Sequence, residues 1–244
     1  MANLFSSREM TGYLTSQYQL RTVKDVQKDE AAIIEVLEAI RDNRLSNDLV
    51  LLNYYKELPI SFGANIERVE RGVADLAVHK LQAVSMLMQM MTFIKSEHLP
   101  YCVIAKVLKV KKAENIALLT QFSYVHIPSE QRMYVRVTVL DRIEAFFRCG
   151  QQEVRGTIDD ISYGGVAILS SQESALAGNE KGMVTLCLPA TSVEIPGILL
   201  RVDHQQQDRR YVIRLEMDPK SEKILSQFIF QEQIGILREL KDMC

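Results

Sequence analysis

Two short stretches in the second half of the chain carry side chains that could do chemistry. Arg132 and Arg136 stand four residues apart, and their guanidinium groups can pair with carboxylates or hold an anion. Asp160 and Ser162 belong to the second stretch, DISYGG, where such side chains cap turns and a glycine supplies a positive φ. Taken singly, the arginines are typical of surface ion pairs, and the second stretch is typical of an ordinary turn.

The order of the two stretches is more informative than either stretch alone. The arginine pair leads into the first strand of a β-rich region, and the turn with Gly164 and Gly165 follows about two strands later. Few ordinary β-barrels have this order by accident. Arg210 and Arg214 repeat the RxxxR spacing, which shows how easily that spacing arises, and we expect Arg210 to have no role in binding.

The composition predicts a globular protein without an overall electrostatic preference. The chain has 244 residues, of which 47% are hydrophobic, and this is enough for two ordinary domains. Its 29 basic and 31 acidic residues nearly cancel, so the net charge does not indicate a nucleic acid or an anionic membrane as partner. Any anion site must therefore be local.

Targeting, metal-binding and catalytic signals are missing from the sequence. Residues 1–21 lack the basic start and apolar block of a signal peptide, and no stretch approaches the ~20 apolar residues of a spanning helix. The four cysteines are far apart and are expected to be free thiols in a reducing compartment. There is no glycine-rich phosphate loop and no histidine with an evident nucleophile. We therefore predict a cytoplasmic protein that is not an enzyme, has no metal or cofactor, and does not insert into membranes.

The first half of the chain changes from a helical to a β-rich pattern. Apolar residues at helical spacing predict an amphipathic helix over about 22–44, within an N-terminal helical segment, 1–45. Residues 46–128 then contain short β-rich runs with a hairpin turn at Arg71-Gly72, which predicts a first small β-barrel domain.

A polar break after Pro128 separates these runs from a second β-rich series. The second domain, 129–244, has the density of short strands expected of a barrel and ends in a long helix from about 219 to 241. We predict a mainly β fold with flanking helices, in which two small antiparallel β-barrels lie between an N-terminal helix and a long C-terminal helix.

At the two polar stretches the sequence resembles the PilZ family. The hallmark of that family is RxxxR followed some twenty to thirty residues later by D/N-x-S-x-x-G, and both halves are present here. The resemblance covers about 129–244. The preceding domain is similar in layout to the N-terminal module of YcgR-like flagellar-brake proteins, a likeness that rests on no motif.

The resemblance implies a receptor that binds the ligand cyclic di-GMP. A guanidinium group fits the O6 and N7 acceptors of guanine, a carboxylate suits its N1–H and N2–H₂ donors, and a serine hydroxyl can donate to a phosphate. Many relatives have an arginine where this chain has Gln131, so binding of one or of two nucleotides stays open. The residues to which the resemblance assigns the ligand are Gln131, Arg132, Arg136, Asp160, Ser162, Gly164 and Gly165.

The predicted function is a cyclic di-GMP receptor that changes its interdomain arrangement on binding and regulates motility or biofilm-related partners. The protein partner is unidentified, with the flagellar motor as a candidate, and the two amphipathic terminal helices suggest a homodimer. The main alternative is a ligand-blind PilZ-like adaptor for protein contacts. A barrel that binds single-stranded RNA is disfavoured, because tryptophan is absent and no basic patch is interleaved with aromatic residues.

Overall fold

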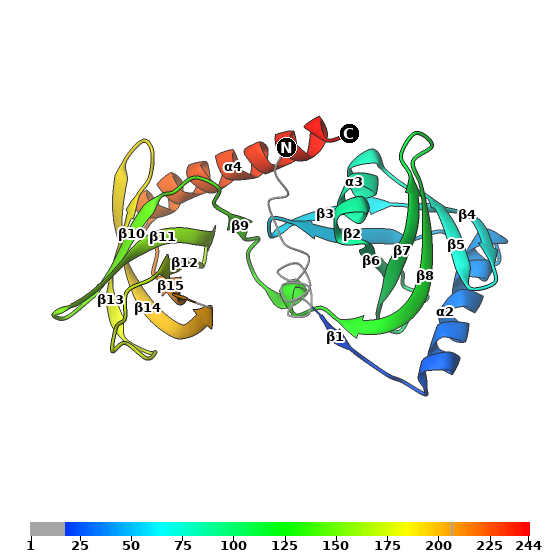
Figure 1. The fold of residues 1–244 in the computed structure, drawn as a ribbon, viewed down its shortest axis with the longest axis horizontal. Coiled ribbons are helices and arrows are strands. Elements are labelled where there is room, and N and C mark those ends of the chain that lie inside the picture. The colour runs from blue at the N-terminus through cyan, green and yellow to red at the C-terminus, as the bar shows by residue number, and fades with distance from the viewer. Residues whose placement is uncertain (1–17, 206) are drawn as a thin grey trace. The chain divides into compact units, whose positions relative to one another are not determined.

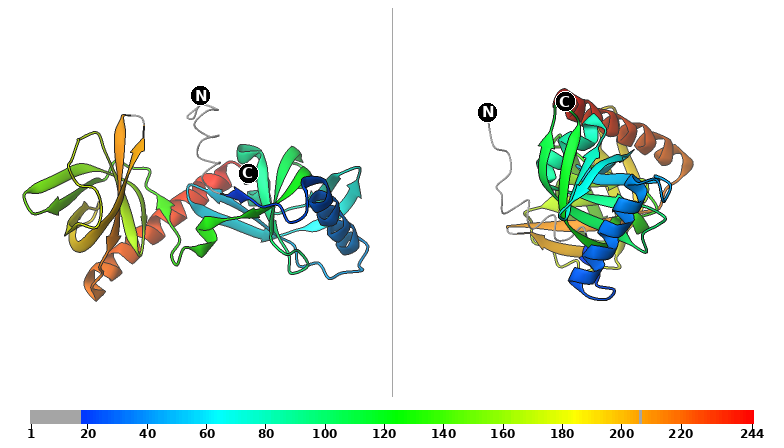
Figure 2. Two further views of the ribbon diagram at one scale, coloured as in Figure 1. Left: turned by 90° about the horizontal axis from the view of Figure 1, so that it is seen from below. Right: turned by 90° about the vertical axis from the view of Figure 1, so that its right-hand side faces the viewer.

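The computed structural model describes residues 18–205 and 207–244, and it confirms the mainly β fold with a helix near each end (Figure 1, Figure 2). The chain divides into two compact units. The first unit takes in the described residues up to Tyr55, then Pro59–Arg132 and Leu240–Cys244. The second unit takes in Lys56–Leu58 and Met133–Glu239.

The first unit contains an antiparallel sheet and two helices. Its strand order is β3-β2-β6-β7-β8-β5-β4, and β1 pairs with β8. Helix α2 contacts β4 and β8, and α3 contacts β2 and β7. The elements are β1 (Gln19–Leu20), α2 (Val26–Arg41), β2 (Val50–Tyr55), β3 (Leu58–Gly63), β4 (Asn65–Glu70), β5 (Val73–Ala77), α3 (Lys80–Gln89), β6 (Met91–Lys95), β7 (Cys102–Lys111), β8 (Ile116–His126) and the 3₁₀ turn η1 (Pro128–Gln131).

Local sequence explains the helix start and the hairpin of this unit. Asp25 caps α2, because its side chain accepts a hydrogen bond from the backbone N–H of Lys28 at 2.8 Å. Buried Ile33 and Leu37 give α2 its apolar face. The predicted hairpin is confirmed: Arg71 and Gly72 both have positive φ, 50° and 76°, as a two-residue turn between strands requires.

The second unit is built on a sheet that closes on itself. Strand β10 pairs with both β13 and β11, which completes the antiparallel ring β10-β13-β14-β15-β12-β11, and β9 is added beside β11. Closure removes the free edges of the ring strands. The elements are β9 (Val137–Thr138), β10 (Glu144–Cys149), β11 (Gln152–Ser162), β12 (Gly165–Ser170), β13 (Lys181–Cys187), β14 (Ser192–Gln205), β15 (Asp208–Leu215) and α4 (Pro219–Asp242).

Alternation along the strands separates the core of this ring from its outer face. On β15, Tyr211 and Ile213 are buried at 0% and 1% exposure, and they pair with Ile168 and Val166 of β12, which are buried as well. Successive side chains of a strand point to opposite faces. Because Tyr211 points into the core, the preceding Arg210 belongs to the outer face. The outer face therefore holds the polar side chains on which the site is built.

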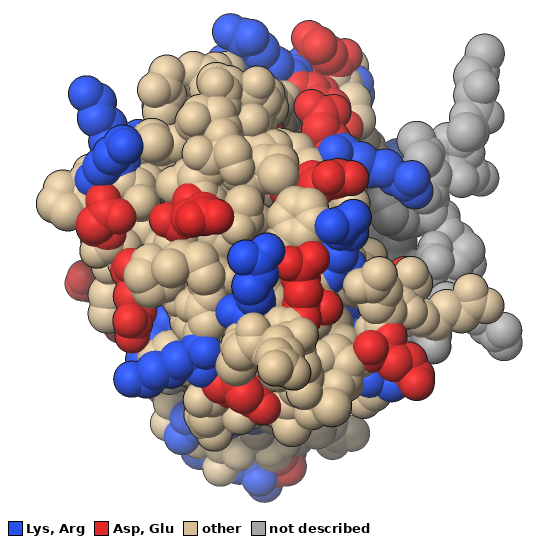
Figure 3. Space-filling model, turned by 90° about the vertical axis from the view of Figure 1, so that its left-hand side faces the viewer, with Lys and Arg blue, Asp and Glu red and all other residues tan. Residues whose placement is uncertain are grey.

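Charges of both signs are interspersed on the face drawn in Figure 3, and no field of one sign covers it. This agrees with the near balance of basic and acidic residues in the whole sequence. No helix within the described part of the chain is long and apolar enough to cross a membrane.

Candidate functional site

The two polar stretches of the sequence meet along one pair of strands. β9 runs antiparallel to β11, with Val137 opposite Ile161 and Thr138 opposite Asp160. Arg136 comes directly before β9, so this pairing carries it to the end of β11 at which the second stretch begins. Its charge acts electrostatically on the carboxylate of Asp160.

The segment that leads into β9 is exposed. Arg132 opens it, and Met133, Tyr134 and Val135 follow with 83%, 44% and 41% of their surface exposed. Gln131 ends the 3₁₀ turn before this segment, and its side chain lies outside the described part of the structure. Three successive exposed apolar residues beside an arginine provide surface on which a planar ligand can stack.

Gly164 is covered by the arginine segment. A Cβ atom at this position would lie 2.9 Å from one ring carbon of Tyr134, closer than real Cβ contacts, and 3.1 Å from a second. The rings of Tyr134 and Tyr163 lie 6.0 Å apart, tilted by 46°. The absence of a side chain at residue 164 therefore lets the segment before β9 lie directly on the turn between β11 and β12.

A glycine is needed at position 165 for a different structural reason from the one expected. The prediction of a positive φ at Gly164 or Gly165 is wrong, because neither adopts one. A Cβ on Gly165 would lie 2.7 Å from the carbonyl oxygen of Ile213 in β15, so the glycine permits the close approach of β12 and β15. The hydroxyl of Ser162, which is 7% exposed, donates a 3.3 Å hydrogen bond to the Gly165 carbonyl and closes the turn.

A β-bulge in β11 puts two neighbouring carboxylates on one side of the strand. The pairing of β11 with β12 shifts register between Ile158 and Asp160, which leaves Asp159 as the extra residue. In a regular strand Asp159 and Asp160 would point to opposite faces. Here both reach the guanidinium of Arg210 on β15: its Nε donates to Asp159 at 2.6 Å, and a second nitrogen pairs with Asp160.

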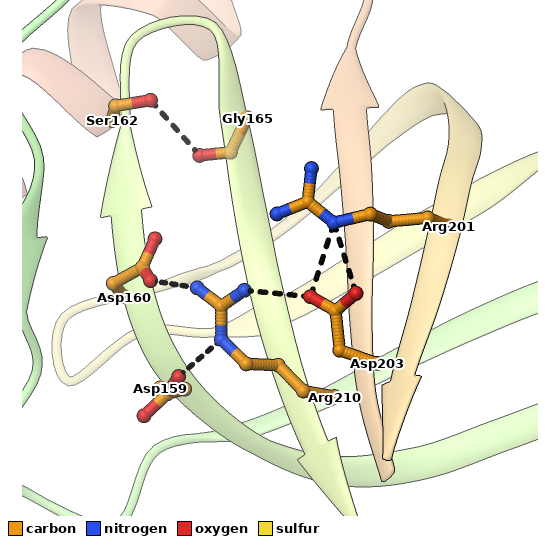
Figure 4. A network of polar contacts seen from close by, with 7 residues as sticks. All are labelled: Asp159, Asp160, Ser162, Gly165, Arg201, Asp203 and Arg210. Carbon is orange, nitrogen blue, oxygen red and sulfur yellow. Dashed lines mark hydrogen bonds and ion pairs between the residues drawn. The ribbon is translucent and has the colours of Figure 1, made fainter. Parts of the chain in front are cut away.

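The same guanidinium also faces a carboxylate of β14 (Figure 4). Nη1 of Arg210 lies 3.5 Å from Asp203, and Asp203 in turn receives hydrogen bonds of 3.0 Å and 3.1 Å from Nε of Arg201. Arg210, which we expected to have no role in binding, is therefore in direct contact with Asp160 of the candidate site.

Burial and charge oppose one another at Asp160. Its surface is 8% exposed, and the loss of water raises the pKa of the carboxyl group, while the charges of Arg210 and Arg136 offset part of that effect. For Arg210, burial alone would lower the pKa of the guanidinium, but the charge of Asp160 and the contacts with Asp159 raise it on balance. The charge of each group therefore favours the ionised form of the other.

One thiol of the first unit is shielded from reaction by burial. Cys102 belongs to β7 of the first unit, and burial raises the pKa of its thiol to about 12, which keeps it protonated and unreactive. Among the residues that the structure describes, no group of three or more His, Cys, Asp or Glu is arranged to hold a metal ion.

Comparison with protein families assigns the second unit. Residues 130–231 match the family described as PilZ domain, and the match spans both polar stretches and the whole closed ring. Residues 130–231 of the chain are therefore similar to a PilZ domain.

Three solved structures illustrate what this chain is similar to. YcgR from Escherichia coli in complex with c-di-GMP is 11% identical, with 94% of this chain and 98% of that chain covered and a TM-score of 0.45. The MrkH–c-di-GMP complex of K. pneumonia is 10% identical, with 91% and 100% covered and a TM-score of 0.45. The Bacillus subtilis inhibitor of motility MotI/DgrA is 16% identical, with 77% and 95% covered and a TM-score of 0.41. The comparison with curated proteins finds no match.

Arg210 is the residue of this cluster that sequence reasoning missed. It lies 50 residues after Asp160, and two strand pairings separate the strands that carry them. The one available signal was the doublet of Asp159 and Asp160 inside a strand, because a carboxylate that becomes buried is usually paired with a cation. Nothing in the sequence indicates which arginine supplies it.

Proposed function

We propose that the PilZ domain of this chain is the binding site of a non-enzymatic cyclic di-GMP receptor. Cyclic di-GMP is the ligand of PilZ proteins. The observation that carries the proposal is the β9–β11 pairing, since it brings Arg136, which comes directly before β9, beside the strand end with Asp160 and Ser162. The two halves of the motif, 24 residues apart from Arg136 to Asp160 along the chain, thereby form one surface.

Each group in this surface suits a part of the nucleotide. The guanidinium groups of Arg132 and Arg136 can pair with guanine O6 and N7 or with a phosphate, and can stack on the base. The carboxylate of Asp160 accepts hydrogen bonds only, which matches the N1–H and N2–H₂ donors of guanine. The hydroxyl of Ser162 can donate to a phosphate if it turns away from the Gly165 carbonyl, to which it donates in the free protein. Gly164 lets the segment with Tyr134 lie directly on the turn, and Gly165 lets β12 approach β15 closely, so both glycines shape the surface beside Asp160.

The expected strength of binding follows from these contacts. Hydrogen bonds to charged groups contribute about 1.5–3 kcal/mol each. Four or five such bonds, partly offset by immobilisation of the side chains and the ligand, suffice for the ~8 kcal/mol of micromolar binding. Many relatives have an arginine at the position of Gln131, so this chain has one charged donor fewer. The stoichiometry of a titration shows whether one or two nucleotides bind.

Calorimetric titration of the full chain with cyclic di-GMP tests the proposal. Arg136→Ala should weaken binding by about 2 kcal/mol or more, roughly 30-fold, because ligand acceptors lose a charged donor. Arg148→Ala is the matched control, since the Arg148 side chain is 67% exposed and pairs with Glu153 in the β10–β11 hairpin. Equal losses in both variants would show that the wrong arginines were chosen. A wild-type protein that binds no cyclic di-GMP would favour the ligand-blind adaptor instead.

We further propose that the bound nucleotide changes the interdomain arrangement and so regulates a motility or biofilm-related protein partner in the cytoplasm. The motif segment that would contact the ligand, Arg132 to Arg136, includes the boundary between the two units at residues 132 and 133. A ligand that orders this segment therefore acts where the two units join in sequence. Co-purification of partners with and without cyclic di-GMP tests this output, and an identical set of partners would contradict it.

A further inference from the structure

Arg210 is surrounded by carboxylates from two other strands of the barrel. Asp159 and Asp160 approach it from β11, and Asp203 approaches it from β14 (Figure 4). The side chains of Arg210 and Asp160 are each only 11% exposed, whereas those of Asp159 and Asp203 are 35% and 38% exposed. The Arg210–Asp160 pair is thus the buried centre of a network whose outer members reach the solvent.

Arg210 is held firmly by this arrangement. All three of its guanidinium nitrogens face a carboxylate, and Asp203 is itself held by both hydrogen bonds from Arg201. A mobile side chain that left Asp160 would have to give up Asp159 and Asp203 as well. The geometry therefore favours an arginine that stays bound to Asp160 over one that leaves Asp160 when a ligand binds.

The carboxylate of Asp160 is divided between two directions. One oxygen, Oδ2, pairs with Arg210, and Figure 4 shows the other oxygen pointing away from that guanidinium. A buried carboxylate without a cation beside it becomes neutral in preference to staying charged. A neutral carboxyl group carries a proton on one oxygen and loses the acceptor-only character that guanine donors need.

We infer that Arg210 is a positioning residue of the ligand site, which keeps Asp160 ionised and turns its second oxygen toward the place of the guanine donors. The inference rests on the proposed function, because it assigns Arg210 a part in the recognition of cyclic di-GMP through Asp160. Arg210 itself touches no ligand in this assignment.

The charges around Asp160 determine how the affinity for cyclic di-GMP should depend on pH. Arg210 and Arg136 act on it as cations, and Asp159 and Glu57 act as anions. Burial raises the pKa of Asp160, and Arg210 is the largest influence that opposes this rise. Removal of Arg210 raises the pKa further. Because guanine donors bind the ionised carboxylate, affinity falls as the pH is lowered through that pKa, and a higher pKa moves the fall to a higher pH.

The test is the affinity of the full chain for cyclic di-GMP between about pH 5 and pH 8, measured by calorimetry. Arg210→Gln should shift the pH of half-maximal affinity upward by about one unit or more, which is roughly tenfold weaker binding on the acidic side. Arg210→Lys keeps the cation without the fork geometry, so it should weaken binding while its pH profile stays near that of the wild type. Arg209→Gln is the control on the same strand, because Arg209 pairs with Glu173 instead of with Asp160.

A double-mutant cycle distinguishes a positioning role of Arg210 from a general loss of stability. In an Asp160→Asn background, Arg210→Gln should add little to the loss of affinity and should no longer change the pH profile. If wild type binds cyclic di-GMP and both Arg210 variants retain its affinity and pH profile, the inference is overturned and the proposed function stands. If Arg210→Gln does not fold, an affinity of Arg210→Lys equal to that of wild type overturns it in the same way. If wild type binds no cyclic di-GMP at all, the proposed function fails and the inference with it.

Discussion

Substitution of Gly165 by alanine should destabilise the barrel whether or not a ligand is present. The new Cβ atom would lie 2.7 Å from the carbonyl oxygen of Ile213 and 3.6 Å from its carbon. Normal contacts between such atoms are longer than 3.0 Å, so the two strands must separate by several tenths of an ångström. The obstructing atom belongs to the backbone of β15, which is paired with β12 over six residue pairs and cannot move cheaply.

The expected cost is that of an overpacked site, about 1–3 kcal/mol in the free energy of unfolding. The matched control is Gly235→Ala in α4, where no atom lies within 4 Å of the new Cβ. Alanine favours a helix over glycine, so this control should be stabilised by about 0.5–1 kcal/mol. The same chemical change is thus predicted to have opposite signs at the two positions.

Urea unfolding followed by circular dichroism measures both variants, and hydrogen exchange of β12 and β15 peptides shows where Gly165→Ala acts. Faster exchange in these two strands, without nucleotide in the sample, is the expected result. A Gly165→Ala protein that is as stable as wild type, with unchanged exchange but lost affinity for cyclic di-GMP, would refute the reasoning. It would mean that the glycine is needed by the ligand and not by the sheet.

Two further predictions concern recognition and the arginine segment. Asp160→Asn should reduce the preference for cyclic di-GMP over cyclic di-AMP more than it reduces phosphate affinity, because an amide both accepts and donates hydrogen bonds. If calorimetry shows the same preference as in the wild-type protein, Asp160 does not read the base. Trypsin should cleave after Arg132 and Arg136 more slowly in samples saturated with cyclic di-GMP, as followed by mass spectrometry. Unchanged cleavage at confirmed occupancy would exclude ordering of this segment.

Several features of the fold were predictable because they depend on neighbours in the chain. The hairpin at Arg71-Gly72 follows from the glycine and the flanking β pattern, and the structure confirms it. The amphipathic spacing predicted a helix over about 22–44, and α2 spans Val26–Arg41. Such features need only periodicity and turn chemistry within a few residues, and no knowledge of the tertiary partner.

The sequence alone also indicated the residues of the motif, because the order RxxxR followed by D-x-S-x-x-G is linear information. The order of residues did not indicate that the two halves of the motif come together in space. Their meeting depends on the pairing of β9 with β11, and the register of that pair decides that Arg136 arrives at the strand end of Ser162. A shift by one residue would have put the facing side chains on the opposite side of the sheet.

Only the tertiary structure decided the role of Arg210 and of the glycines. The bulge at Asp159 turns two adjacent carboxylates to the same face, and closure of the ring brings β15 close enough for one arginine to hold both. Gly165 is required by a carbonyl oxygen 48 residues later in the chain and not by its own φ. Contacts of this kind depend on strands that are distant in sequence and on backbone positions within a few tenths of an ångström, which local residue patterns do not encode.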